Sequence, residues 1–279
     1  MTSADPIPAA VTVEAVLADG RRRVRRDAVL LLLGAAVAVG AFVFVDLFNP
    51  ARYRDALHTI FVLASDAMPP VFERWRKWGG PLLDTLAMSV AGTVLACLMA
   101  LPLSLLAARN VVPSPLGARL GAVVRLFLNM VRSIPGVVWG VIFVAAVGFG
   151  PLPGVFALAC HSTGMLGKFY AEILEHVDPA PGDALRSHGV SRLGVLRFSV
   201  LPQILPRLVD VTVYRWEHNV RAATVLGLVG AGGLGLEIMT AFHLFEYREA
   251  AALILVLLAL VTAINLIGER IRGHFLGRD

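Results

Sequence analysis

Charged residues are scarce in this chain, and this scarcity alone excludes an ordinary soluble domain. Only 16% of the 279 residues are Asp, Glu, Lys or Arg, while 57% are hydrophobic. Soluble domains average roughly 25% charged and 45–50% apolar residues. Together with a mean hydropathy of +0.74, the composition predicts an all-α integral membrane protein, since each helical span needs about 20 apolar residues.

Cysteines and catalytic motifs are also nearly absent. The two cysteines, Cys97 and Cys160, both fall in apolar segments, and we interpret them as small core residues rather than a disulfide. The sequence has no G-x-x-x-x-G-K-[ST], H-E-x-x-H or G-x-S-x-G pattern, and its seven histidines show no metal-ligand spacing. These absences argue against a membrane enzyme, a metal site and an ATP site in this chain.

One apparent nucleotide motif does occur, in the run GLVGAGGLG, where Gly230, Gly232 and Gly235 match G-x-G-x-x-G. A dinucleotide fingerprint follows a short strand and has an acidic residue about 20 positions later. Here the run follows a long apolar segment, 206–228, and no carboxylate stands at that place. We therefore predict that these glycines, with Gly233, form a hinge where helices approach closely and the chain turns.

Six apolar segments predict six transmembrane helices, at about 28–48, 81–107, 120–148, 152–174, 206–228 and 248–268. The third is expected to be interrupted at RSIPG, where Pro135 removes a helical donor and acts as a further hinge. Basic residues collect before the first span, in RRRVRR, and after the last. The positive-inside rule then places both termini in the cytoplasm, and it explains the net charge of +5 without nucleic acid.

The predicted organisation has five parts. They are a cytoplasmic arm (1–27), a first span (28–48), an extracytoplasmic amphipathic segment (49–80), a core domain (81–272) and a cytoplasmic tail (273–279). In the amphipathic segment, Trp75 and Trp78 are expected at the depth of the lipid headgroups.

The stretch between the fourth and fifth spans is too polar to cross a membrane and predicts a helix–turn–helix. Pro181 can open a first helix, and Gly189 can end it in a left-handed conformation. Ser191 can cap a second helix that ends before Pro202. Apolar residues recur along that second helix at Leu193, Leu196 and Val200. Such a pair is typical of a docking site for a cytoplasmic partner, and an ordinary interfacial loop is the alternative.

This stretch resembles the loop E-A-A-x₃-G-x₉-I-x-L-P of permease subunits of bacterial ABC importers. Six positions carry the resemblance: Asp183, Ala184, Leu185, Gly189, Leu201 and Pro202. Asp183 replaces the usual Glu, and Ser199 occupies the usual isoleucine position. In that family the loop is a coupling helix that inserts into a cleft of the ATP-hydrolysing subunit, and the resemblance implies the same role for residues 183–202.

From about Arg132 to Arg272 the chain is similar to the phosphonate-importer branch of these permeases, most closely in RSIPG and in VLPQILPRLVDVTVYRWEHNVRAATVLGLVGAGGLG. The resemblance implies a type I, MetI-like permease of the bacterial inner membrane that imports phosphonate, phosphate or phosphite. It also implies an ABC ATPase that holds the ATP and Mg²⁺, an extracytoplasmic substrate-binding protein, a second permease copy (identical or a close paralogue) and surrounding lipids as partners.

The predicted fifth span contains five polar residues that are costly in a membrane, Arg215, Glu217, His218, Asn219 and Arg221. An ionisable residue there costs about 2.5–3.5 kcal/mol or more, so it normally faces the protein interior and has a partner. Glu217 and Arg221 have the spacing of an i,i+4 pair. Arg215 is then the less compensated cation, with His218 or Asn219 as its candidate partner. Two interpretations stay open: a structural lock, or a translocation path whose guanidinium groups suit an oxyanion.

Further candidates for the lining of that path are Arg132, Ser133, His161, Ser162, Thr163 and Lys168. Two other functions also stay open. One is a permease of the same class for another small solute, such as the amino acid methionine, which the charged sequence RWEHNVR disfavours. The other is an ion-gradient-driven carrier in which Glu217 and His218 relay protons.

Overall fold

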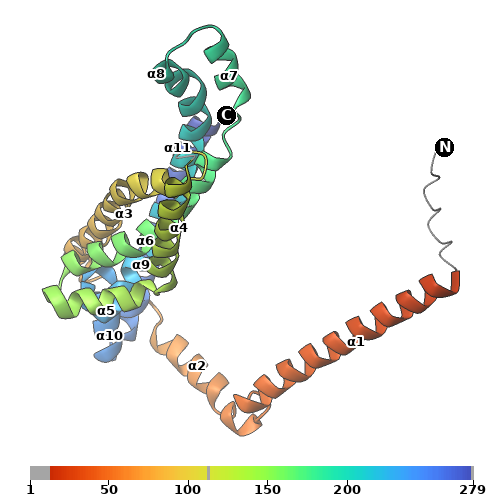
Figure 1. The fold of residues 1–279 in the computed structure, drawn as a ribbon. Coiled ribbons are helices and arrows are strands. Elements are labelled where there is room, and N and C mark those ends of the chain that lie inside the picture. The colour runs from red at the N-terminus through yellow and green to blue at the C-terminus, as the bar shows by residue number, and fades with distance from the viewer. Residues whose placement is uncertain (1–12, 112–113, 278–279) are drawn as a thin grey trace, which may run out of the picture. The chain divides into compact units, whose positions relative to one another are not determined.

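The computed structural model describes residues 13–111 and 114–277, and all regular elements within these ranges are helical. The predicted all-helical class is therefore confirmed. The chain divides into an N-terminal unit that ends at Ala64 and a C-terminal unit that begins at Ser65 (Figure 1).

The N-terminal unit consists mainly of α1 (Val13–Phe44), followed by the 3₁₀ turn η1 (Pro50–Arg52) and by α2 (Ala56–Asp66) near its end. The stretch Gly20–Phe44 is long and apolar enough to cross a bilayer, which agrees with the first predicted span. The basic run at 21–26 lies within this stretch and belongs to the same helix, α1. Residues 1–12 of the predicted arm lie outside the described residues.

The predicted amphipathic segment 49–80 is not one surface helix. It is broken into η1, α2, an irregular stretch and the short 3₁₀ turn η2 (Trp75–Lys77). Trp75 is exposed, but Trp78 is only 4% exposed and packs in a core with Leu234 and Leu253. Trp78 is therefore held by packing inside the protein, and its depth at the headgroups stays a prediction.

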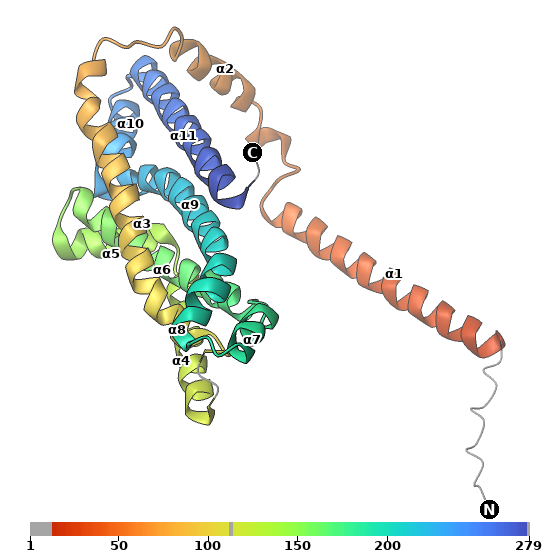
Figure 2. The same ribbon diagram turned by 90° about the horizontal axis from the view of Figure 1, so that it is seen from above.

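The C-terminal unit is a bundle whose main helices are α3 (Gly79–Ala107), α4 (Pro115–Ser133), α5 (Gly136–Val147), α6 (Pro151–Glu175), α9 (Leu201–Leu226), α10 (Gly233–His243) and α11 (Tyr247–Leu276). Helix α6 is central and packs against α3, α4, α5 and α9 (Figure 2). Gly164 lets α6 approach the α4 backbone, since a Cβ there would lie 2.8 Å from the Leu128 carbonyl oxygen. Helix α11 continues through the predicted tail as far as Leu276.

Hydropathy identifies fewer candidate spans in the described chain than the predicted six. By length and composition, three helices of the described chain can cross a membrane, or up to five if two bent helix pairs each count as one span. The predicted fourth span is α6, which is long enough but less apolar, and which buries Ser162 and Thr163 almost completely. A helix surrounded by protein rather than lipid does not need a uniformly apolar surface, so hydropathy underestimates it.

The predicted interruption at RSIPG is present and is sharper than a kink. Helices α4 and α5 meet at 85°, with Ile134 in an extended conformation (φ −79°, ψ 122°). The cause is Pro135, which lacks a backbone N–H and disfavours a helical conformation in the residue before it. The short α5 therefore crosses the bundle instead of continuing α4.

The second helix of the predicted helix–turn–helix does not end before Pro202. Helix α8 (Arg192–Val195) passes through the π-helical turn η3 (Leu196–Val200) directly into α9. A proline cannot donate to the carbonyl four residues earlier, and a π turn shifts the local hydrogen bonding so that the helix continues. The expected boundary at Pro202 is thus wrong.

Candidate functional site

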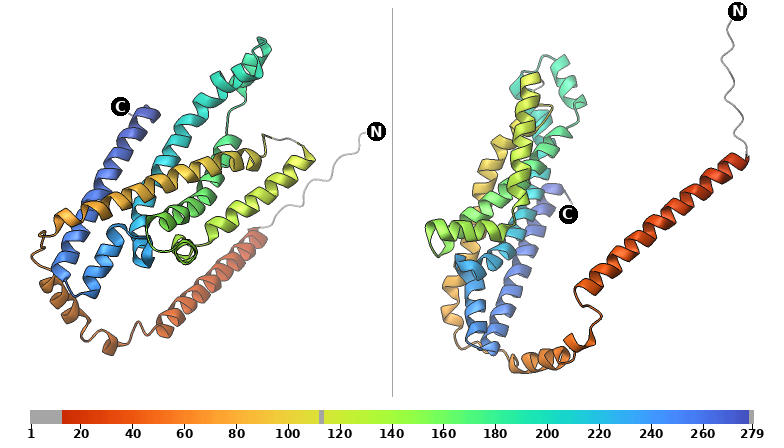
Figure 3. Two further views of the ribbon diagram at one scale, coloured as in Figure 1. Left: turned by 90° about the vertical axis from the view of Figure 1, so that its left-hand side faces the viewer. Right: turned by 60° about the horizontal axis from the view of Figure 1, so that its bottom comes forward.

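A helical hairpin projects from the C-terminal unit (Figures 1 and 3) and contains the predicted coupling loop. It consists of α7 (Ala180–Ser187) and the α8–η3 helix. Gly182 is buried where the two arms meet. A Cβ at this position would lie 3.3 Å from Val195 Cγ1 and 3.4 Å from Ser199 Oγ, so the absence of a side chain lets the arms approach closely. The residue in the usual isoleucine position, Ser199, is thus part of the contact between the arms.

The turn of the hairpin is formed as its residues predict. Gly189 has φ +76°, and its N–H donates to the Arg186 carbonyl at 2.9 Å while Val190 N–H donates to the Leu185 carbonyl at 3.1 Å. Ser191 Oγ caps α8 by accepting from the Gly194 N–H at 3.3 Å. These bonds satisfy the carbonyls and amides left free at the two helix ends.

The outer surface of the hairpin exposes both apolar and charged side chains. Leu193 and Phe198 are 75% and 68% exposed, and Asp183 forms an exposed ion pair with Arg186 at 2.5 Å. Of the six motif positions, Leu185 is half-buried and the other five are exposed. Most of the motif is therefore accessible to a partner.

A buried hydrogen-bonded network joins α9 to two other helices. Asn219 donates from Nδ2 to Thr93 Oγ1 of α3 at 2.8 Å and accepts at Oδ1 from Ser162 Oγ of α6 at 3.0 Å. Arg215 Nε donates to the same Ser162 Oγ at 2.9 Å. Arg215 is 5% exposed and Asn219 fully buried, so Asn219 is held by protein contacts, and Arg215 is anchored at one of its nitrogens.

Glu217 points to a different helix. Its carboxylate accepts from Arg272 Nη1 of α11 at 2.7 Å, and Arg221 Nη1 instead reaches Asn265 Oδ1 at 3.4 Å. The expected pair of Glu217 with Arg221 is thus wrong, because the two side chains find partners on α11. Gly268 makes room for this contact, since a Cβ there would collide with Glu217 Oε1.

A cavity of about 260 Å³ lies between α5, α6 and α9. Its polar lining consists of His161, Arg215, His218 and Arg221, and the rest is glycine or apolar side chain. Arg215 Nη2 is buried without a hydrogen-bond partner. At about 30 Å³ per water molecule, the cavity has room for a small tetrahedral anion.

The other predicted lining residues lie elsewhere. Arg132 and Ser133 bond to Asn129 within α4, Thr163 donates to the Ala159 carbonyl within α6, and Lys168 forms an exposed pair with Glu172. Arg272, Asn265 and Thr93 were not predicted to take part. The spacing of Asn265 and Arg272 by seven residues, two turns of one helix face, is the sequence signal for α11.

The glycine run forms a sharp turn. Gly230, Gly232 and Gly233 have φ values of +99°, +81° and +71°, a region that is strained for other residues. Within the π turn η4 (Gly227–Ala231) the chain breaks, and the helix from α8 through α9 meets α10 at 58°. Gly227 and Gly235 touch across this bend, where a Cβ on either would collide with backbone.

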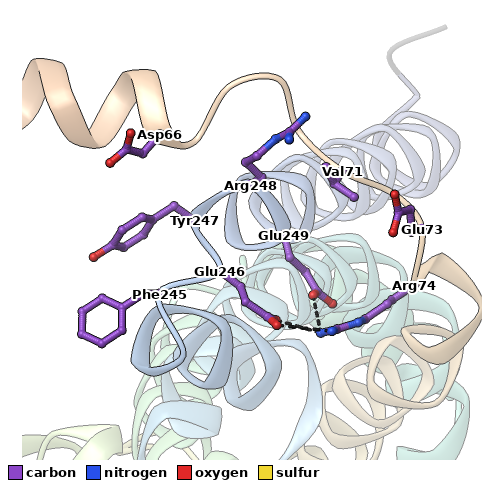
Figure 4. Close-up of a pocket in the computed structure, with 9 residues that line it drawn as sticks. All are labelled: Asp66, Val71, Glu73, Arg74, Phe245, Glu246, Tyr247, Arg248 and Glu249. Carbon is purple, nitrogen blue, oxygen red and sulfur yellow. Dashed lines mark hydrogen bonds and ion pairs between the residues drawn. The ribbon is translucent and has the colours of Figure 1, made fainter.

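A second pocket, of about 500 Å³, lies where the irregular stretch after α2 meets the start of α11 (Figure 4). Arg74 Nη1 donates to carboxylate oxygens of Glu246 and Glu249, both at 2.7 Å. The hydrogen bond from Arg74 lowers the pKa of Glu246 below its usual range, and the two carboxylates raise the pKa of Arg74. Arg248 Nε donates to the Pro69 carbonyl at 2.8 Å, so several polar contacts tie this stretch to α11.

Comparison with known proteins identifies the family. Residues 100–278 match the family described as "Binding-protein-dependent transport system inner membrane component". The chain belongs to this family. The permease is 49% identical to the phosphite transport system permease protein PtxC of Stutzerimonas stutzeri over 83% of each chain. It is 38% identical to the phosphate-import permease protein PhnE of Mycolicibacterium smegmatis over 81% of this chain and 42% of that protein.

The fold of the permease is that of known importers. The methionine ABC transporter MetNI in an inward-facing conformation has a chain that matches with a TM-score of 0.59 and 23% identity, over 69% of this chain and 93% of that one. The permease is thus the inner-membrane, multi-pass component of an ABC importer, and ATP hydrolysis belongs to a separate subunit. An ATPase and a binding protein are its partners, which overturns the alternative of an ion-gradient-driven carrier.

Proposed function

We propose that this permease imports a phosphorus oxyanion, namely phosphite, a phosphonate or phosphate, and that Arg215 lines its path. The observation that carries the proposal is a guanidinium group that is 5% exposed, lines a cavity and has one nitrogen without a partner. A cation buried at such cost normally has a compensating partner. An anion that enters the cavity would supply it.

The distribution of charge around the cavity supports this assignment. The nearest buried carboxylate on α9, Glu217, is already paired with Arg272, and no carboxylate lines the cavity in the described part of the chain. Guanidinium donors form a planar fork that fits phosphorus oxyanions. Because Arg215 also donates to Ser162, part of its capacity is used internally, which keeps cargo binding weak enough for release.

The relatives add independent support for the cargo. Transport of phosphite is named for the relative with 49% identity, and import of phosphate for the relative with 38% identity. The methionine transporter supports the fold alone at 23% identity. An amino-acid cargo is therefore the weaker candidate, and it becomes an outcome of the transport assay.

In the proposed mechanism, residues 183–202 dock on the ATPase, which binds ATP and Mg²⁺, and two permease copies, identical or closely paralogous, enclose the path. The exposed apolar surface of the hairpin supports the docking role, because contiguous exposed apolar residues mark interaction sites. The glycine turn and the break at Pro135 would serve as hinges of the gate facing the binding protein. Glu217 and Asn219 would hold α9 in place, and Arg221 would line the cavity with Arg215.

The test is uptake by the complete importer in proteoliposomes that contain its ATPase and binding protein. We expect ATP-dependent uptake of at least one of the three oxyanions. We expect Arg215→Met to reduce it at least tenfold without loss of assembly, whereas Arg119→Met, which changes an exposed arginine of α4, leaves uptake intact. Uptake of methionine without any oxyanion would refute the cargo, and normal oxyanion uptake by Arg215→Met would refute the role of Arg215.

A further inference from the structure

His161 is held in one tautomer by the break between α4 and α5. Its Nδ1 lies 3.0 Å from the carbonyl oxygen of Ile134. A carbonyl only accepts hydrogen bonds, so Nδ1 carries the proton. Near the start of α5 the backbone amides of Val138 and Trp139 both donate to the carbonyl of Pro135. The carbonyl of Ile134 therefore accepts no bond from these amides and is available to His161.

The other ring nitrogen is left for the cavity. In a neutral imidazole whose Nδ1 carries the proton, Nε2 is an acceptor only. Nε2 of His161 has no hydrogen-bond partner in the described ranges, and the side chain lines the 260 Å³ cavity together with Arg215. The cavity thus presents a buried donor without a partner, Arg215 Nη2, and an acceptor of fixed orientation.

The remaining lining contains one other imidazole, that of His218, and no hydrogen bond in the described ranges fixes its tautomer. From α9 the cavity receives the side chains of His218 and Arg221 besides Arg215, and from α5 it receives Gly136 and Val137, which carry no titratable group. From α6 the other lining residues are Ala157 and Leu158. His161 is therefore the imidazole whose tautomer is set by a backbone contact.

We propose that His161 is a specificity-determining residue that accepts a hydrogen bond from the P–OH group of a singly charged phosphorus oxyanion. Arg215 Nη2 donates to an ionised oxygen of the same ion. This inference rests on the proposed function and adds a chemical requirement to it. The phosphite monoanion has one P–OH group and meets the requirement, whereas the hypophosphite anion, with two P–H bonds and no P–OH, does not.

Two substitutions separate the contact with the cargo from the contact with the backbone. In His161→Asn the amide nitrogen takes the place of Nδ1, so the bond to Ile134 is kept and the Nε2 acceptor is lost. In His161→Gln the amide reaches the place of Nε2, so the acceptor is kept and the bond to Ile134 is lost. His176→Asn is the matched control, because His176 Nδ1 also contacts a carbonyl, that of Glu172, at an exposed position outside the cavity.

The variants are compared in the complete importer by the initial rate of phosphite uptake and by the thermal midpoint of the complex. We expect His161→Asn to lose about tenfold in phosphite uptake, as for one hydrogen bond to a charged ligand, with a midpoint near that of the wild type. We expect His161→Gln to retain more uptake but to have the lower midpoint. His176→Asn should resemble the wild type in both.

The decisive result is that the two His161 variants rank in opposite order by phosphite uptake and by thermal midpoint. If uptake and thermal midpoint fall in the same order in the two His161 variants, the residue is structural and the inference fails. It also fails if His161→Asn reduces hypophosphite uptake as much as phosphite uptake. Wild-type importer that carries no phosphorus oxyanion would instead refute the proposed function, so the two failures are distinguishable.

Discussion

Replacing Arg272 with methionine would leave the Glu217 carboxylate buried without its partner. The side chain of Glu217 is 7% exposed, that of Arg272 is 21% exposed, and their atoms lie 2.7 Å apart. Breaking a buried ion pair by removing one partner costs about 3–5 kcal/mol. Because water reaches part of Arg272, we expect the lower limit, about 3 kcal/mol of unfolding free energy, or roughly two powers of ten in the unfolding equilibrium.

The measurement is reversible unfolding of the detergent-solubilised permease in mixed micelles with increasing dodecyl sulfate. Tryptophan fluorescence is a suitable signal, since Trp216 directly precedes Glu217 in α9. Asp210→Asn is the matched control. Asp210 lies 3.9 Å from the same arginine and its side chain is 45% exposed, so its loss should cost less than about 1 kcal/mol.

A double-mutant cycle isolates the pair. The variant that combines Glu217→Gln with Arg272→Met leaves no buried carboxylate unpaired at this contact, so its loss should fall about 2 kcal/mol short of the sum of the two single losses. Strict additivity, or equal losses for Arg272→Met and Asp210→Asn, would refute the view that this ion pair holds α9 against α11.

Three further outcomes are expected. Gly268→Ala should cost about 1–3 kcal/mol by crowding the carboxylate of Glu217, measured by the same unfolding assay, with Gly80→Ala, which meets no neighbour within 4 Å, as a nearly neutral control. Gly189→Val should abolish the stimulation of ATP hydrolysis by loaded binding protein, because φ is +76° there and a β-branched residue strains the turn; unchanged hydrolysis would contradict the coupling role. Because the folded-state pKa of Glu246 lies below its usual value of 4.5, the stabilisation by Arg74 should be present above that value and lost as the pH falls through the folded-state pKa. The protection factor of the amides around residue 71, which is corrected for the intrinsic pH dependence of exchange, should then fall on acidification in the wild type but not in Glu246→Gln.

The features that the sequence predicted well are those determined by local chemistry. Apolar runs of spanning length correspond to α1, α3 and α11, because their length alone matches a bilayer. Pro135 breaks the helix by removing a donor, and Gly189 adopts the left-handed conformation that ends α7. Each of these effects acts within a few residues, so no knowledge of the packing is needed.

The features that the sequence did not predict depend on which helices become neighbours. Glu217 has an arginine at the favourable i,i+4 distance, yet it pairs across the bundle because Gly268 allows α11 to come close. Helix α6 has a low hydropathy for a membrane span because protein covers much of its surface. Trp78 packs against residues of α10, a helix that was not predicted because the glycine run hides its start in the sequence. Pro202 did not end its helix because the preceding π turn shifts the hydrogen bonding, so the proline ring does not collide with the carbonyl four residues earlier.

The unbroken helical run from Arg192 to Leu226 has a mechanical consequence. Arg215 lies 14 residues beyond Leu201, which is about 21 Å along the axis. Pro206 lies between them and removes one backbone hydrogen bond, but the helix continues through it. If the run moves as one piece, a tilt of about 10° at the hairpin end shifts the buried guanidinium sideways by about 4 Å, given that rise per residue. Such a shift exceeds the length of a hydrogen bond, so under the proposed coupling a small movement of the hairpin would make or break the contact between Arg215 and a bound anion.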